Sequence, residues 1–187
     1  MKPKLGAPPS AARTGVFVGM GAIAMSFAAY TSAMMVRRES APDWHHVQVP
    51  SILYVNTLLL LASSVALESG RRHIGDDYEV GPHARSRLLL ALALGIAFLV
   101  GQVLAWRQLA QQGLFLATNP SSSFFYVFTA AHGLHLLGGL VALAYMLRRV
   151  SVAVGPGTSG ALSAVAWYWH FMDALWLYLL GVLTLWL

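Results

Sequence analysis

The sequence has no cysteine and few charged side chains. Without Cys the chain cannot form disulfide bonds, thiolate metal sites, thiolate-bridged copper centres or a covalent c-type haem attachment. Asp, Glu, Lys and Arg make up only 10% of its 187 residues, whereas soluble domains carry about 25%. The low charge therefore argues against a soluble globular domain.

Long apolar runs take the place of the missing charge. Apolar residues make up 57% of the chain, and the mean hydropathy is +0.62. A helix needs about 20 apolar residues to cross about 30 Å of hydrocarbon, and the runs are continuous rather than alternating as in a transmembrane barrel. We expect an all-α polytopic membrane protein, a bundle of five transmembrane helices at approximately 15–36, 50–70, 87–107, 122–148 and 161–187.

The organisation follows from these five runs. Residues 1–14 are rich in Pro and Ala and are expected to form a loose cytoplasmic N-terminus. The remaining residues, 15–187, form one transmembrane domain, and its short connections predict that sequential helices pack as neighbours. The first run is too long for the core of a signal peptide and ends in Arg37 and Arg38, so we interpret it as a retained span.

The distribution of basic residues predicts the orientation. The N-terminus and the second and fourth connections hold nine Lys and Arg residues, and the first and third connections hold three. Basic residues favour the cytoplasmic side, which places the N-terminus in the cytoplasm and the C-terminus outside. Because the net charge of +5 comes from residues at span ends, we do not expect nucleic acid as a partner.

Four ionisable side chains lie inside the predicted spans. His132 and His135 occur in TAAHGLHLLGGLVAL, and His170 and Asp173 follow in the last span. Histidines at i and i+3 share a helix face, and such groups usually face the bundle interior. At about 1.5 Å per residue, His135 and Asp173 lie at roughly 18 Å and 14 Å from the cytoplasmic ends of their spans. The two side chains are therefore expected to meet.

The residues alone leave several interpretations of these four side chains. They could hold a metal ion, ligate a b-type haem through His135 and His170, or relay protons. The interpretation we favour is an interhelical His–Asp hydrogen-bond network that sets the helix register. Glu68 is expected to pair with Arg71 or Arg72, and Gly138 and Gly139 to permit a close approach of a neighbouring helix.

Two longer stretches resemble a known family. SFFYVFTAAHGLHLLGGL and WYWHFMDALWLYLL, with VNTLLLLASS and GIAFLVGQVLAWRQL before them, resemble subunit III of the haem–copper terminal oxidases. The resemblance covers nearly the whole chain after Gly15. The size matches the shorter bacterial form with five helices.

The resemblance implies a non-catalytic subunit in the bacterial cytoplasmic (inner) membrane. Such a subunit carries no haem or copper, packs against the catalytic subunit I and other oxidase subunits, binds structural phospholipid and helps to sustain proton uptake. The chain could also work within a respiratory supercomplex. The resemblance assigns no catalytic role to the motif residues, which are Asn56, Thr57, Gln102, Phe125, Thr129, His132, His135, Gly139, His170, Asp173 and Trp176.

The chain departs from the family pattern at two places. Ala22 and Ile23 stand where many members carry Ser-Glu or Thr-Glu, and Ala105 stands where many carry Glu. No role that depends on those carboxylates transfers to this chain. Two other functions stay open from the sequence: an accessory subunit of a nitric oxide reductase, and a small b-type cytochrome or metal-dependent membrane enzyme that uses His132, His135, His170 and Asp173.

Overall fold

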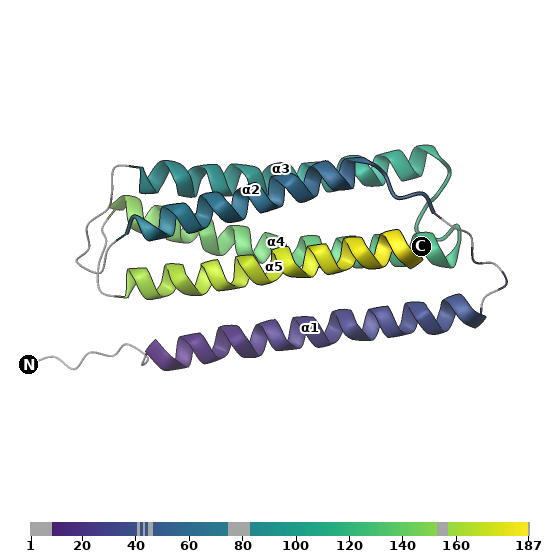
Figure 1. Ribbon diagram of the computed structural model, residues 1–187, viewed down its shortest axis with the longest axis horizontal. Helices are drawn as coiled ribbons and strands as arrows, with labels where there is room; N and C mark the ends of the chain where they lie inside the picture. Colours follow the sequence, from purple (N-terminus) through teal and green to yellow (C-terminus); the bar gives the residue numbers. More distant parts are fainter. Residues whose placement is uncertain are drawn as a thin grey trace, which may run out of the picture.

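The computed structural model describes residues 9–40, 42, 44, 47–74, 83–152 and 157–186. Within them it contains five α-helices, each long and apolar enough to cross a membrane. This confirms the predicted all-α membrane class. The helices, shown in Figure 1, are α1 (Pro9–Ser40), α2 (Ile52–Arg72), α3 (Ala84–Gln111), α4 (Pro120–Val152) and α5 (Thr158–Trp186).

Most of the helices extend beyond the apolar runs that predicted them. α1 begins at Pro9, so residues 9–14 are helical rather than loose, which corrects the expected N-terminal boundary. Proline is favoured in the first turn of a helix, where its missing N–H has no intrahelical partner. Polar side chains do not interrupt backbone hydrogen bonds, so α3 continues to Gln111, shortly before Gly113 with its φ of 77°.

Helices α2, α3, α4 and α5 form a ring in which each contacts the next and α5 closes against α2. Helix α1 lies outside this ring against α4 and α5, and Figure 1 shows it set apart from α2 and α3. The expectation that sequential helices pack as neighbours is therefore confirmed from α2 to α5. It is wrong for α1 and α2, between which the described residues make no contact.

A narrow stripe attaches α1 to the ring. Met20, Phe27 and Met34 are buried at seven-residue intervals, while most other residues of α1 are exposed. This spacing keeps one face of a helix against its neighbour. Thr31 joins the stripe, and its hydroxyl accepts a hydrogen bond of 2.9 Å from the hydroxyl of Tyr178 on α5. Helix α1 is therefore held by one narrow stripe of side chains against α4 and α5, and it lies outside the closed ring of the other four helices.

Glycines allow the ring helices to pack closely around large aromatic side chains. A Cβ atom at Gly95 of α3 would lie 2.9 Å from the ring of Trp169 of α5, which is fully buried. A Cβ atom at Gly101 would lie 2.0 Å from Oδ1 of Asn56, so the Asn56 amide occupies the space above this glycine. Small residues at such crossings let membrane helices approach each other.

We predict that Gly101→Ala destabilises the α2–α3 contact. The added methyl group would overlap the buried Asn56 side chain, and overpacking of this kind costs about 1–3 kcal/mol. Thermal melting of the purified protein in detergent measures the loss. Gly133→Ala is the control, because its Cβ atom would meet only Leu99 at 3.7 Å. Equal melting temperatures for the two variants would contradict this account of the crossing.

Candidate functional site, a polar seam between the helices

Trp176 marks the point where all four ring helices meet. Its indole N–H donates a 2.9 Å hydrogen bond to the hydroxyl of Thr57 on α2. Its ring centroid lies 4.9 Å from that of Phe98 on α3 and 5.0 Å from that of His132 on α4. Trp176 is fully buried. One side chain of α5 thus sets the register of the other three helices.

His132 links α4 directly to the backbone of α5. Its side chain is fully buried, and Nε2 lies 3.2 Å from the carbonyl oxygen of Met172. A carbonyl only accepts hydrogen bonds, so Nε2 carries the proton in this contact. Nδ1 has no protein partner. His132 therefore joins α4 to α5 at Met172, the residue before Asp173.

His135 faces a different neighbour from His132. Its Nδ1 lies 2.7 Å from the carbonyl oxygen of Ala131 in its own helix, and its ring packs 6.0 Å from that of Phe27 on α1. The expected meeting of His135 with Asp173 does not occur. Three residues correspond to a rotation of about 300° around the helix axis. His135 therefore points about 60° away from the direction of His132, and this difference turns it toward α1.

Ser64 of α2 contacts His170 of α5. Its hydroxyl lies 2.6 Å from Nδ1 of His170, whereas Oδ1 of Asp173 is buried without a hydrogen-bond partner among the described residues. Nε2 of His170 lies 3.7 Å from Oε2 of Glu68. The expected network is thus corrected: the hydrogen bonds of the three intramembrane histidines go to a serine or to backbone carbonyls rather than to Asp173.

Glu68 forms the ion pairs expected from its spacing. Its two carboxylate oxygens accept hydrogen bonds of 2.8 Å and 2.7 Å from Nε and Nη2 of Arg71. Nε of Arg72 donates to the same carboxylate at 2.8 Å. Arg71 also donates to Ser163 of α5 at 3.3 Å. The carboxylate thus holds the end of α2, and Arg71 ties that end to α5.

The remaining motif residues lie in the interfaces of α2, α3 and α4. Gln102 is 3% exposed, and neither atom of its amide group has a protein partner. Thr129 accepts a 2.9 Å hydrogen bond from the indole of Trp106 and donates one of 2.7 Å to the carbonyl of Phe125, which is fully buried. These side chains are packed between neighbouring helices, as is Asn56 above Gly101.

Gly139 lies at a close crossing of α4 and α5. A Cβ atom there would lie 3.1 Å from the ring of Tyr168 and 3.4 Å from that of Trp169, whereas a Cβ atom at Gly138 would meet nothing within 4 Å. The predicted close approach is therefore confirmed at Gly139 and wrong at Gly138. The neighbours at Gly139 are aromatic side chains. The hydroxyl of Tyr168 donates to the backbone oxygen of His135 at 2.9 Å.

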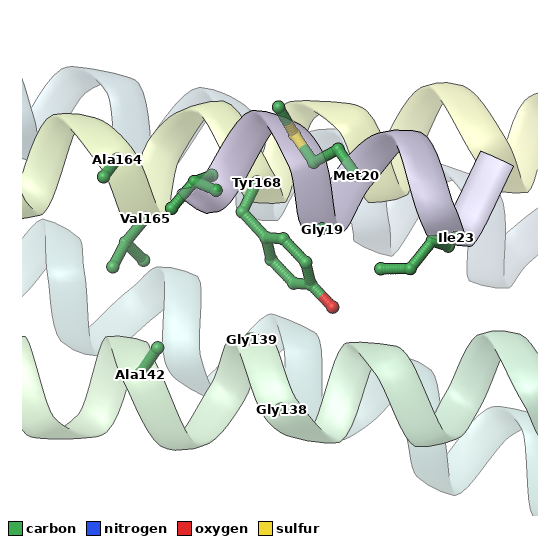
Figure 2. A pocket seen from close by; sticks show the side chains of 10 residues that line it. Gly19, Met20, Ile23, Gly138, Gly139, Ala142, Ala164, Val165 and Tyr168 are labelled. Carbon is green, nitrogen blue, oxygen red and sulfur yellow. The ribbon is translucent and has the colours of Figure 1, made fainter. Parts of the chain in front are cut away.

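An apolar groove opens beside Gly138, between α1, α4 and α5. Its volume is about 310 Å³. Figure 2 shows Met20 and Ile23 of α1 on one wall, the Tyr168 side chain across the space, and Gly138 on the opposite wall. Ile23 stands where many family members are expected to carry a carboxylate, and Ala105, at the other such position, is fully buried. At both positions an apolar side chain therefore lies among other apolar side chains.

The geometry does not favour a metal or haem site at the four ionisable residues. Among the described residues, no group of three or more His, Asp or Glu side chains is placed to hold a metal ion. The imidazole of His132 faces the interior of the four-helix ring. The imidazole of His135 faces α1, and that of His170 faces α2. Ligands of one metal must converge, and a shared haem needs two histidines that face each other.

Comparison with known proteins agrees with this architecture. The family model for cytochrome c oxidase subunit III matches residues 16–187. The chain belongs to this family. A probable cytochrome c oxidase subunit 3 of Mycobacterium tuberculosis is 29% identical over 94% of this chain and 88% of its own length. The corresponding Synechocystis protein is 30% identical over 88% and 71%, and that of Corynebacterium diphtheriae is 33% identical over 71% and 64%.

Family membership decides the biological setting. The chain is a multi-pass membrane subunit of a bacterial respiratory oxidase, and it associates with other oxidase subunits. The family generally carries no metal cofactor, and the divergent directions of the three histidine rings fit that property.

Sequence reasoning missed the two hydroxyl groups that complete this site. Ser64 contacts His170, and Tyr168 binds the α4 backbone. The adjacent serines Ser63 and Ser64, inside an apolar run, were the signal for the first. Ser63 donates to the carbonyl oxygen of Ala91 on α3 at 2.8 Å. Neighbouring hydroxyls on α2 therefore serve the helices on its two sides.

We predict measurable coupling between Thr57 and Trp176. Thr57→Val removes the acceptor of the buried indole N–H, and Trp176→Phe removes the donor. A double-mutant cycle on unfolding in SDS should give about 0.6 kcal/mol and no more than about 1.7 kcal/mol, the average and the maximum for hydrogen bonds between membrane helices. Thr57→Val combined with Trp186→Phe, at the far end of α5, is the control cycle. A coupling energy no larger than in the control cycle would show that the hydrogen bond from Trp176 does not link α5 to α2.

Proposed function

We propose that this chain is a non-catalytic subunit that stabilises the haem-bearing catalytic subunit I of its oxidase and supports that subunit's proton uptake. The observation that carries the proposal is the use of the intramembrane histidines in helix contacts. His132 contacts the α5 backbone, and His135 contacts its own helix and Phe27. His170 contacts Ser64. Family membership over residues 16–187 supports the partner.

The proposed orientation places the basic end of the bundle in the cytoplasm. This end carries Arg71, Arg72, Arg85, Arg87, Arg148 and Arg149, and the positive-inside bias favours it there. The C-terminus then lies outside, because α1 begins and α5 ends at opposite ends of the bundle (Figure 1). Asp173 lies near the middle of α5, and Glu68 and His170 lie in the cytoplasmic half under this orientation. His170 is thus on the side from which an oxidase takes up protons.

The apolar groove is the proposed site of a bound phospholipid. A volume of about 310 Å³ lined by Gly, Ala, Val, Ile, Met and Tyr side chains suits part of an acyl chain. Because α1 is attached by one stripe, a lipid in this groove would add contacts between α1 and the ring. The lipid would therefore stabilise the most weakly packed helix.

The association is tested by purifying the tagged chain from its native membrane in mild detergent and recording a reduced-minus-oxidised spectrum. We expect an a- or o-type haem signal that travels with a larger partner and is lost from this chain when the partner is stripped away. The stripped partner should keep its initial oxidase turnover and lose it sooner than the intact preparation.

Two results would contradict the proposal. Haem that stays with the stripped 20.2 kDa chain would make it a cytochrome. Equal inactivation rates for the intact and the stripped oxidase would show that the chain does not sustain turnover. Adding the purified chain back to the stripped partner, with matched detergent and lipid, is the control for damage during stripping.

For the lipid, we predict that Gly138→Trp removes one tightly bound phospholipid from the purified complex. A Cβ atom at Gly138 meets nothing within 4 Å, so the indole can enter the groove without displacing the helix. Native mass spectrometry counts the retained lipids. Leu134→Trp, at a position one turn earlier that is 69% exposed, is the matched control. An unchanged lipid count in Gly138→Trp would show that the groove holds no tightly bound lipid.

A further inference from the structure

A second, polar surface lies between α2 and α5, on the side of α5 away from α4. Two adjoining hollows of about 450 Å³ and 490 Å³ share Glu68, Arg72 and His170. Ser64 lines the first, and Arg71 and Ser163 line the second. We refer to these six residues as the α2–α5 hollow. In Figure 1, α5 lies between α2 and α1, which do not contact each other among the described residues.

The polar surface extends well into the apolar part of the spans. The hydrogen bond between Arg71 and Ser163 marks one level on both helices, at the end of α2. His170 lies seven residues further along α5, roughly 10 Å deeper. Its side chain is 40% exposed, and that of Glu68 is 22% exposed. Ionisable groups open to lipid at this depth are costly, so another polar molecule is expected to cover them.

The chemistry of the hollow argues against lipid as its occupant. The lining of the apolar groove beside Gly138 has no charged side chain and suits an acyl chain, whereas the α2–α5 hollow has Glu68, Arg71 and Arg72 in its walls in addition to the apolar Val65, Ala166 and Trp167. A lipid phosphate would meet the Glu68 carboxylate, which already binds Nε and Nη2 of Arg71 and Nε of Arg72. Two arginines against one carboxylate still leave one positive charge, and the Arg72 side chain is 73% exposed. A phosphate would also suit that charge, but only a protein helix could in addition place a hydrogen-bonding group beside His170, roughly 10 Å deeper.

We propose that the α2–α5 hollow is the docking surface for a transmembrane helix of the catalytic subunit. That helix places a carboxylate or amide oxygen opposite Arg72 and a polar group beside His170. Membrane helices associate through polar contacts of this kind because hydrocarbon offers no competing partner. The inference rests on the proposed function, since it assumes that the catalytic subunit binds this chain, and it adds which surface is used.

Site-specific photo-crosslinking in the assembled complex tests the surface. A benzophenone amino acid replaces Val65, which lines the hollow and is 70% exposed. The matched control is Val141 of α4, also 70% exposed, on the helix diagonally across the ring from α2. Irradiation of native membranes should join position 65 to the catalytic subunit at least tenfold more than position 141.

Several results would overturn the docking surface. These are crosslinks to the catalytic subunit from position 141 and none from position 65, crosslinks from position 65 to a second copy of this chain, or crosslinks from position 65 to phospholipid alone. Each would leave the proposed function intact if the tagged, unsubstituted chain still purifies with a haem-bearing partner. Loss of that co-purification would instead refute the proposed function.

The charge complementarity has its own test. Arg72→Gln should lower the retention of the catalytic subunit in a salt wash by about tenfold, because a buried charge-assisted contact governs dissociation. Arg72→Lys keeps the charge and should restore most of the retention. Arg107→Gln, at the opposite end of the bundle, is the control and should change nothing. Equal retention for Arg72→Gln and Arg107→Gln would refute a role for Arg72 in docking.

Discussion

The structure depends on one constraint: inside hydrocarbon, polar groups must find partners within the protein. Trp176 shows how the chain meets it. The indole N–H binds Thr57, and the ring packs against Phe98 and His132, so one buried residue joins all four ring helices. Ser63, Ser64 and Thr129 connect helices through their hydroxyl groups in the same way. These contacts need only short side chains placed at matching depths.

The same constraint divides the outer surface into two kinds of hollow. Beside α1 the chain has Ile23 and glycines, and the resulting groove is apolar. Between α2 and α5 it has Glu68, two arginines and His170. The first kind of surface suits lipid and the second suits a polar partner.

Much of the fold follows from local sequence. The apolar runs predict five spans because the length of a crossing helix is set by the thickness of the hydrocarbon. The pairing of Glu68 with Arg71 and Arg72 follows from helical spacing alone. The helix ends were less predictable, as α1 shows by beginning at Pro9. Hydropathy indicates which residues lie in the hydrocarbon, whereas the ends of a helix are set by where its backbone hydrogen bonds stop.

The sequence by itself determined the membrane class, the family, the local ion pairs and the set of polar residues that lie within the spans. Only the tertiary structure decided which helix each of them faces. His132 and His135 are three residues apart, yet one contacts α5 and the other α1. Ser64 meets His170 from another helix. The reason is that the rotation of each helix about its axis is set by packing with all its neighbours at once.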